Sequence, residues 1–163
     1  MASYHPSSGG TSVLALDCEM VGVGEEGQYS KKFGKRYDIL ARVSIVDQNG
    51  TCIYDKYVKP TQVVTDYRTD TSGIHPEDIE NGEDFIKVQK EVADILNGND
   101  DNNKILVGHS IEYDLKVLHL KHPTELIRNT AYYSPCSLND EGKTCGLKDL
   151  AARHLGISIQ VSR

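Results

Sequence analysis

Two carboxylates stand two positions apart in this sequence, directly after a run of apolar residues. They are Asp17 and Glu19, within the stretch Val13–Met20. A short continuous apolar run favours a buried strand, on which alternate side chains share a face, so we expect both acids to point the same way. Paired carboxylates on a buried strand repel each other, and a bound cation relieves that repulsion. Their hard oxygen atoms favour Mg²⁺ or Mn²⁺.

A plainer interpretation is open at this point, in which the strand ends at Leu16 and both acids are solvated. Apolar residues continue beyond the acids at Met20, Val21 and Val23. This continuation favours a strand that carries the acids into the body of the protein, and therefore favours a metal site.

A third acid, Asp114, falls where it can join the first two. It lies just over one turn into a helix predicted over Ile111–His119, which Ser110 can N-cap. That helix directly follows a short apolar strand, Ile105–Gly108, so Asp114 lies near the carboxyl end of a strand. His109 also follows this strand directly and can edge the same site.

The elements that must position these residues alternate between strands and helices, as in an α/β protein. The predicted elements are strands at Val13–Met20, Ile39–Asp47 and Thr51–Val58, a short helix from Pro76, a helix over Glu83–Leu96, a strand at Ile105–Gly108, a helix over Ile111–His119, a short helix at Pro123–Ile127, a strand at Arg128–Tyr132 and a helix over Leu147–Leu155.

The connections between these elements predict a mixed sheet. Asn49-Gly50 is typical of a tight hairpin turn, so the strands at 39–47 and 51–58 are expected to be antiparallel. The helix before Ile105 is a crossover, which predicts that the strand at 105–108 runs parallel to the first. We expect the Val13–Met20 strand in the centre. Residues 59–72 are expected to form a long connection.

Length and composition limit the classes of protein to which this chain can belong. The chain has 163 residues and a formal net charge of −6, which fits one domain over residues 12–163 behind a loose lead-in at 1–11. No apolar run reaches membrane-spanning length. The four cysteines show no paired spacing, and His119 and His122 lack partners for a zinc set. The acidic balance argues against a protein that binds nucleic acid by charge alone, but not against a nucleic-acid enzyme with divalent metals.

Five segments resemble a known family. Leu16–Gly22 and Val107–Leu118 are similar to the first and second exonuclease motifs of the DEDDh family of ribonuclease-H-like 3′→5′ exonucleases. The segments between them resemble the RNA exonuclease 4 branch: Ala41–Val46, Tyr54–Pro60 and Thr65–Thr69. The similarity extends over nearly the whole chain, from residue 13 to about residue 160.

This resemblance implies a ribonuclease-H-like fold, with a mixed central sheet and flanking helices, and two metal ions about 3.5–4 Å apart. Asp17 would bridge both ions, Glu19 would hold the one that carries the attacking water, and Asp114 would support the other. Met20 would pack at the 3′-terminal nucleotide and Arg68 would approach its sugar or phosphate. The substrate would be the 3′ end of single-stranded RNA, with DNA as the alternative, and a 2′-hydroxyl contact would favour RNA. Nuclear or nucleolar rRNA processing is the implied role.

The sequence departs from the family at two places. A general-base His and a fourth metal-binding Asp should follow a segment matched by Leu155–Gln160, but the chain ends at Arg163. We therefore expect a fragment or truncated isoform that lacks the C-terminal helix and is weak or inactive as an exonuclease. Residues 25–38 are also longer than the usual connection. They contain a basic run, Lys31 to Arg36, that could contact phosphate, serve as a targeting signal or form a solvated loop.

Two rival functions are open. One is a catalytically impaired fragment that acts only as a nucleic-acid-binding or regulatory module. The other is a metal-dependent endonuclease on the same fold, which the match at Thr65–Thr69 disfavours. Metal-dependent degradation of RNA separates an exonuclease from the binding module, and blocking the RNA 3′ end separates it from the endonuclease.

Overall fold

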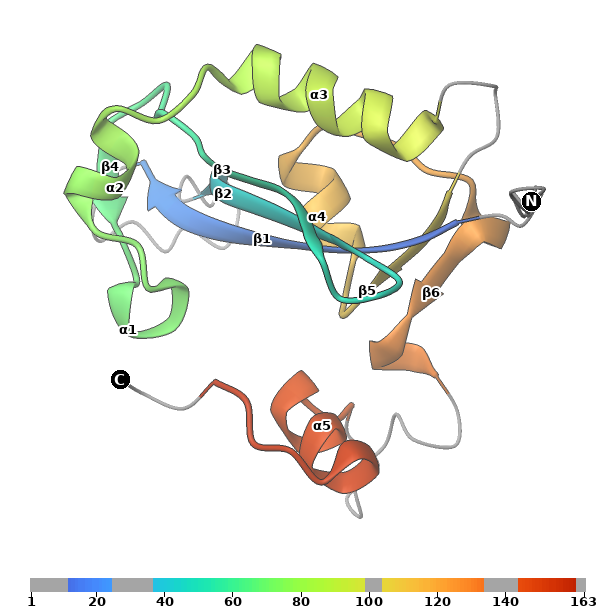
Figure 1. The fold of residues 1–163 in the computed structure, drawn as a ribbon. Coiled ribbons are helices and arrows are strands. Elements are labelled where there is room, and N and C mark those ends of the chain that lie inside the picture. Colours follow the sequence, from blue (N-terminus) through green and yellow to red (C-terminus); the bar gives the residue numbers. More distant parts are fainter. Residues whose placement is uncertain (1–11, 25–36, 99–103, 134–143, 161–163) are drawn as a thin grey trace, which may run out of the picture.

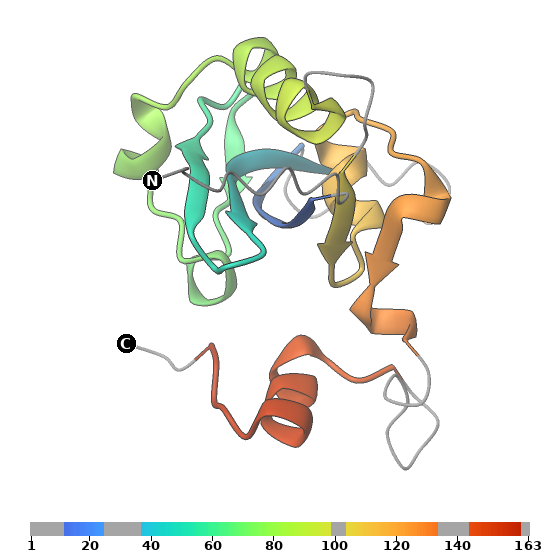
Figure 2. The ribbon, with the colours of Figure 1, turned by 45° about the vertical axis from the view of Figure 1, so that its right-hand side comes forward.

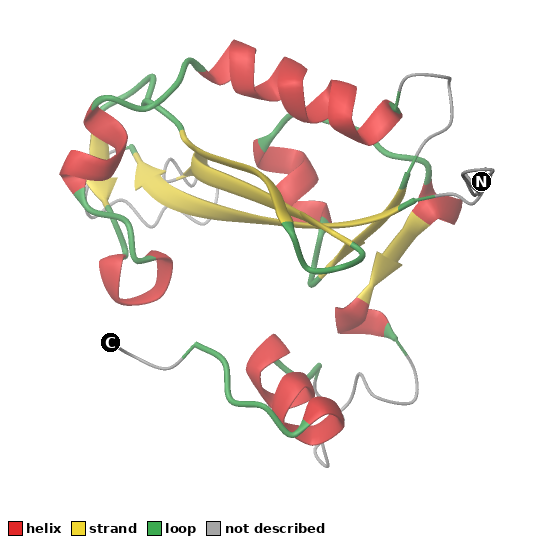
Figure 3. Ribbon diagram, viewed as in Figure 1, coloured by secondary structure: helices red, strands yellow, loops and turns green. Residues whose placement is uncertain are grey.

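A mixed six-stranded sheet forms the centre of the protein in the computed structural model, which describes residues 12–24, 37–98, 104–133 and 144–160 (Figures 1 and 3). The strands are β1 (Val13–Val23), β2 (Tyr37–Asp47), β3 (Cys52–Tyr57), β4 (Val64–Asp66), β5 (Ile105–Gly108) and β6 (Ile127–Asn129). The helices are α1 (Thr69–Ser72), α2 (Pro76–Glu80), α3 (Phe85–Asn97), α4 (Glu112–Val117) and α5 (Leu147–Leu155), with 3₁₀ turns η1 (Thr124–Leu126) and η2 (Thr130–Tyr132).

Strand β1 is the centre of the sheet, as predicted. The strand order is β3-β2-β1-β5-β6, and β4 pairs with β1 outside this path. Strands β1, β2 and β3 are antiparallel neighbours, whereas β5 runs parallel to β1 and β6 parallel to β5. The predicted antiparallel and parallel pairings are therefore confirmed.

The predicted hairpin between β2 and β3 is confirmed at Asn49-Gly50. The Asp47 carboxylate accepts hydrogen bonds from the backbone N–H groups of Asn49 at 2.8 Å and Thr51 at 2.9 Å. Gly50 has a φ of 80°, in the left-handed region that glycine adopts without steric cost. These contacts fix the register between β2 and β3.

Two hydrophobic clusters lie on the sheet. Helices α3 and α4 cover one cluster, which contains Leu14, Leu16 and Cys18 of β1. The second cluster includes Val21 of β1 and Ile79 of α2. Helix α3 lies along one side of the sheet and α5 on the other in both ribbon views (Figures 1 and 2). Strand β1 thus contributes to both clusters.

The main helices form where the sequence predicts them. Helix α3 begins after Asp84, whose side chain accepts hydrogen bonds from the N–H groups of Ile86 and Lys87, and it ends at Asn97, with Gly98 as its C-cap. Helix α5 spans the predicted residues, but only part of its apolar stripe is covered. Leu150 and Ala151 are buried, whereas Leu155 is 70% exposed.

Three predictions about local structure are corrected. The connection predicted at 59–72 contains β4, which pairs with the end of β1 beyond the central ladder, and helix α1. Ser110 does not cap α4: Ile111 holds the N-cap position without a side-chain hydrogen bond, and Ser110 has a φ of 57°. The strand predicted at 128–132 is shorter and earlier, at Ile127–Asn129, because η2 follows it.

Several predictions lie outside the described residues. These are the lead-in at 1–11, the basic run at 31–36 and the residues after 160. No described helix is long and apolar enough to span a membrane.

Candidate active site

Strand β1 presents Asp17 and Glu19 on the face opposite Cys18. Cys18 is 8% exposed and belongs to the core, whereas Asp17 reaches the surface and Glu19 is half-buried. This is the alternation predicted for a strand that continues through the acids. The interpretation in which the strand ends at Leu16 is wrong, since β1 extends to Val23.

Helix α4 brings Asp114 to the open edge of β1. Strand β5 pairs with β1 only as far as Ala15, opposite Val107, and β4 pairs with β1 only from Gly22, so the backbone of β1 between these points has no strand partner on this side. The Asp114 carboxylate takes the place of the missing strand and accepts the Cys18 N–H at 2.8 Å. Asp114 is 5% exposed, and its contact with β1 was expected from its place early in the helix.

The three acids influence one another's ionisation. Burial, followed by repulsion from Asp17, raises the pKa of Asp114 to about 6, although the Cys18 hydrogen bond opposes this. Burial and repulsion from Asp17 and Asp114 raise the pKa of Glu19 to about 7. Burial also raises the pKa of Asp17, against the positive influence of Arg42 and His109. Asp17, Glu19 and Asp114 therefore share one electrostatic environment.

Arg42 is a site residue that the sequence reasoning missed. It stands opposite Glu19 in the β1/β2 register. Its guanidinium forms two hydrogen bonds with Asp55, at 2.7 and 2.6 Å, and its carbon centre lies 5.3 Å from the centroid of the Tyr57 ring. Asp55 and Tyr57 thus hold the Arg42 guanidinium beside the acids. The available signal was the predicted central position of the Val13–Met20 strand, because β2 is the next strand in the chain and pairs with it.

The acids fit a hard divalent cation in their chemistry. Their atoms are carboxylate oxygens, which Mg²⁺ and Mn²⁺ prefer, and burial together with repulsion between the acids raises the pKa values of Glu19 and Asp114, a cost that a bound cation would relieve. Within the described part of the chain, no three His, Cys, Asp or Glu side chains lie close enough together, as placed, to hold a metal. Cation binding would therefore draw the carboxylates closer.

His109 lies beside this acidic group and is held by Thr130, the first residue of η2. Its Nδ1 is 3.0 Å from Thr130 Oγ1, and Thr130 donates its hydroxyl hydrogen to the Gly108 carbonyl at 3.1 Å. Because that hydrogen is used, Thr130 Oγ1 accepts the proton on Nδ1. The Nε2 atom of a neutral His109 is consequently the proton-free nitrogen.

Met20, which follows Glu19 on β1, lines a cavity. The cavity has a volume of about 560 Å³ and also includes Tyr37, Asp38, Tyr113 and Lys116 in its wall. The structure thus places one predicted substrate residue, Met20, at a site large enough for a small organic group.

Arg68 reaches this cavity indirectly. Its guanidinium pairs with the carboxylate of Asp38, which lines the cavity, and lies 3.6 Å from that of Asp66. Its φ is 50°, in the turn between β4 and α1. Arg68 is therefore anchored at the rim, whereas Met20 contributes directly to the wall.

Comparisons with known proteins agree with this geometry. The exonuclease family model (RNase_T) matches residues 14–159. RNA exonuclease 4 of Mus musculus is 51% identical over 150 residues, which cover 92% of this chain and 32% of that protein. RNA exonuclease 4 of Mycosarcoma maydis is 50% identical, over 91% of this chain and 36% of that protein. The chain spans about a third of the length of these relatives.

Solved structures share the fold. The pseudoubiquitin-hydrolase–RNase module of Pan2 from Saccharomyces cerevisiae matches with a TM-score of 0.74 and 27% identity, over 96% of this chain and 25% of that chain. The same module in complex with AAUUAA RNA matches with a TM-score of 0.74 and 25% identity, over 93% of this chain and 25% of that chain. The chain therefore belongs to the exonuclease family, in the DEDDh group to which its motifs point, and is similar to the RNA exonuclease 4 branch.

Proposed function

We propose that this chain is the catalytic domain of a metal-dependent 3′→5′ exoribonuclease that removes nucleotides from the 3′ end of single-stranded RNA. The observation that carries the proposal is the contact of the Asp114 carboxylate with the backbone of β1 at Cys18, between Asp17 and Glu19, which couples the three acids electrostatically. The family match and the names of the RNA exonuclease relatives support it.

The proposed roles of the acids follow from their positions. Two bound divalent ions would activate water and stabilise the leaving oxygen of the phosphodiester. Asp17, Glu19 and Asp114 would hold these ions. Because the pKa values of Glu19 and Asp114 are raised to about 7 and about 6, loading them requires proton release and is favoured as the pH rises. The positive charge of Arg42 offsets part of the negative charge of Asp17 and Glu19, but Arg42 does not bind the metal ions.

The cavity provides the proposed place for the terminal nucleotide. Met20 offers an apolar contact for the sugar or base, and Lys116 supplies a positive charge in the same wall. The Arg68–Asp38 ion pair stands at the rim. We propose that substrate entry rearranges this pair, so that Arg68 approaches the sugar or phosphate, and that His109 contacts the nucleotide from the other side of the acids.

A direct test uses single-stranded RNA labelled at its 5′ end. With Mg²⁺ or Mn²⁺, products should shorten one nucleotide at a time, at the low rate expected from the sequence, and chelation or Asp17→Asn should stop the reaction. A phosphate on the RNA 3′ end should block degradation. Internal cleavage of the blocked RNA would point to an endonuclease, whereas binding without metal-dependent cleavage would support a binding or regulatory module.

The proposed cellular role is processing of ribosomal RNA in the nucleus or nucleolus, as the resemblance implies. Its support is the similarity to RNA exonuclease 4. Depletion of the full-length protein should lengthen the 3′ ends of precursor ribosomal RNAs, and unchanged ends would remove this role while leaving the biochemical activity untouched.

A further inference from the structure

Two tyrosine rings stand exposed near the acidic site. Tyr113, on α4, is 60% exposed, and Tyr132, in η2, is 65% exposed. Single exposed aromatic residues are ordinary on protein surfaces. These two differ because Tyr113 directly precedes Asp114 and because both flank one carboxylate, that of Glu112.

Hydrogen bonds hold the Tyr132 ring in place. Its hydroxyl donates to Glu112 Oε1 at 2.8 Å, and the side-chain N–H of Asn129 donates to Glu112 Oε2 at 2.8 Å. The side-chain oxygen of Asn129 in turn accepts the backbone N–H groups of Ser110 and Ala131. An exposed ring that is already fixed loses little conformational entropy when a ligand stacks on it.

The two rings belong to the same stretch of surface as the cavity. Tyr113 lines the cavity together with Met20 and Lys116. Tyr113 follows Glu112 in α4, and the Glu112 carboxylate accepts a hydrogen bond from the Tyr132 hydroxyl, so the two tyrosines lie on one stretch of surface. The surface from Met20 over Tyr113 to Tyr132 is therefore continuous with the proposed site of the terminal nucleotide.

We infer that Tyr113 and Tyr132 form a stacking surface for the bases of the single-stranded RNA next to its 3′-terminal nucleotide. The inference rests on the proposed function. Aromatic side chains bind single strands by base stacking, whatever the sequence, because every base has a π-face. The Glu112 carboxylate, which accepts the Tyr132 hydroxyl hydrogen bond, repels phosphates, so the bases face this surface and the backbone runs away from it. In a chain with a net charge of −6, stacking supplies affinity that charge cannot.

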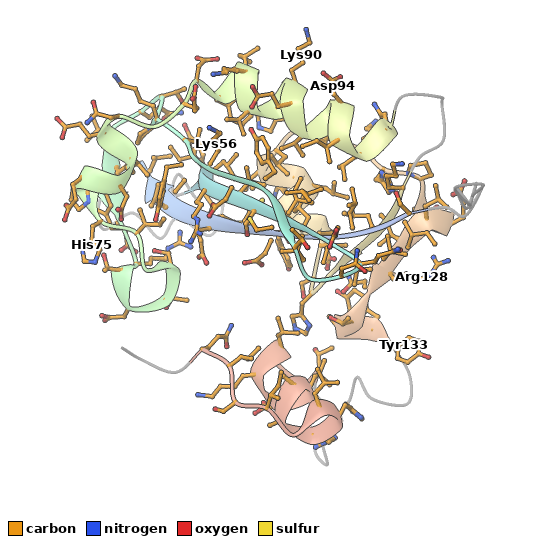
Figure 4. The ribbon with its side chains drawn as sticks, in the orientation of Figure 1. Lys56, His75, Lys90, Asp94, Arg128 and Tyr133 are labelled. Carbon is orange, nitrogen blue, oxygen red and sulfur yellow. The ribbon has the colours of Figure 1, made fainter. Side chains whose placement is uncertain are left out.

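The experiment measures RNA binding by fluorescence anisotropy in the presence of Mn²⁺. It uses the full 163-residue chain carrying Asp17→Asn, which prevents turnover. Tyr113→Leu and Tyr132→Leu should each weaken binding about tenfold, the scale of one lost base stack. Tyr132→Phe keeps the ring and should lose less. The control is Tyr133→Leu: Tyr133 is 67% exposed and extends from η2 away from the sheet (Figure 4), so this variant should bind RNA as the parent does.

A second probe separates stacking from general effects of the substitutions. RNA with abasic residues next to its 3′ end should bind weakly and equally to the parent and to the Leu variants. The inference is overturned if the Leu variants bind normal RNA like the parent, if Tyr133→Leu causes the same loss, or if the loss persists on abasic RNA. If the Leu variants keep the RNA affinity of the parent, the exposed rings serve another partner, such as a protein, and the inference is wrong.

Failure of the inference is distinguishable from failure of the proposed function. If the chain cleaves RNA in an Asp17-dependent manner but the tyrosine substitutions leave binding unchanged, only the inference fails. If the tyrosines support binding and no cleavage occurs with metal, only the exonuclease proposal fails. If single-stranded RNA does not bind at all, both fail.

Discussion

Glu19 is the residue at which burial and charge conflict most directly. It is half-buried, it shares its face of β1 with Asp17, and its pKa is raised to about 7. Asp114 is in a similar position on α4, with a pKa of about 6. In the absence of a cation, the folded protein therefore binds protons at these residues more tightly than the unfolded chain does.

This difference predicts how stability depends on pH. The folded pKa values of Glu19 and Asp114 lie above their usual values of 4.5 and 3.8, so protonation stabilises the folded state. That contribution is complete below the usual values and is lost as the pH rises through about 6 to 7. We expect the chelated protein to unfold at a lower urea concentration at about pH 8 than at about pH 5.

The control for the pH prediction is Glu19→Gln, which cannot ionise at this position. This variant should show a smaller change in the urea midpoint between the two pH values and a higher midpoint at the higher pH. Groups with lowered pKa values, such as Asp47 and Asp55, titrate below this window. A parent protein that is more stable at the higher pH would contradict the prediction.

Cation binding should depend on the two most closely coupled carboxylates. We expect Mn²⁺ to stabilise the parent chain and the double variant Asp17→Asn/Asp114→Asn to bind it at least tenfold more weakly, because two of three oxygen ligands lose their charge. Isothermal titration at neutral pH measures the affinity. Asp70→Asn, at an exposed acid of α1, is the matched control. Equal affinity in the parent and the double variant would mean that these acids are not a metal site.

At the scale of elements, the tight approach of β5 and α4 decides where Asp114 lies. A Cβ atom on Gly108 would stand 2.5 Å from Ile111 Cδ1 and 2.9 Å from Ile111 Cβ. The chain can therefore turn from the strand into the helix in three residues only because residue 108 has no side chain. Ile111 is 1% exposed, so it has little room to yield.

Gly108→Ala should consequently destabilise the protein by about 1–3 kcal/mol, the usual cost of overpacking. It should also weaken Mn²⁺ binding, since a displaced α4 moves Asp114 away from β1. Urea denaturation and metal titration measure the two effects. Gly146→Ala is the control, because its new Cβ would meet only Asp149 Oδ2 at 3.9 Å, and its effect should stay within about 0.5 kcal/mol.

The elements that the sequence predicted are those with long or distinctive local patterns. The apolar run of β1, the Asn49-Gly50 turn and the helical spacing of α3 each lie within one stretch of chain. Strand β4 was missed because three residues are too few to show alternation, and it exists only through pairing with β1. Ser110 was assigned the wrong role because Asn129, distant in sequence, accepts its backbone N–H.

The candidate site likewise contains residues with a local sequence signal and residues whose contacts come from distant segments. Asp17, Glu19 and Asp114 could be predicted because each has a signal in its own segment. The anchoring of Glu112 by Asn129 and Tyr132, and of His109 by Thr130, could not be predicted. These contacts depend on the parallel pairing of β5 with β6, which sequence patterns leave open.

For the molecule as a whole, β1 connects the two hydrophobic clusters. Leu16 contributes to one and Val21 to the other, so loss of either cluster removes support from the same strand. We expect one cooperative unfolding transition, with coincident circular dichroism and tyrosine fluorescence; the chain has no Trp. Leu106→Ala and Ile79→Ala, one in each cluster, should each cost about 2–5 kcal/mol and move the entire transition. Two separate transitions would show that the clusters unfold independently.

The two borders of the sheet have a consequence for self-association. Strand β6 has three residues and is enclosed by the 3₁₀ turns η1 and η2. Strand β3, at the other border, carries Asp55 and Lys56. Interrupted and charged borders offer a poor template for strand addition by a second chain, which is how exposed sheet edges begin to aggregate. The fold thus keeps its open edges unattractive to other copies of itself, while the rings of Tyr113 and Tyr132 remain free to meet a different kind of polymer.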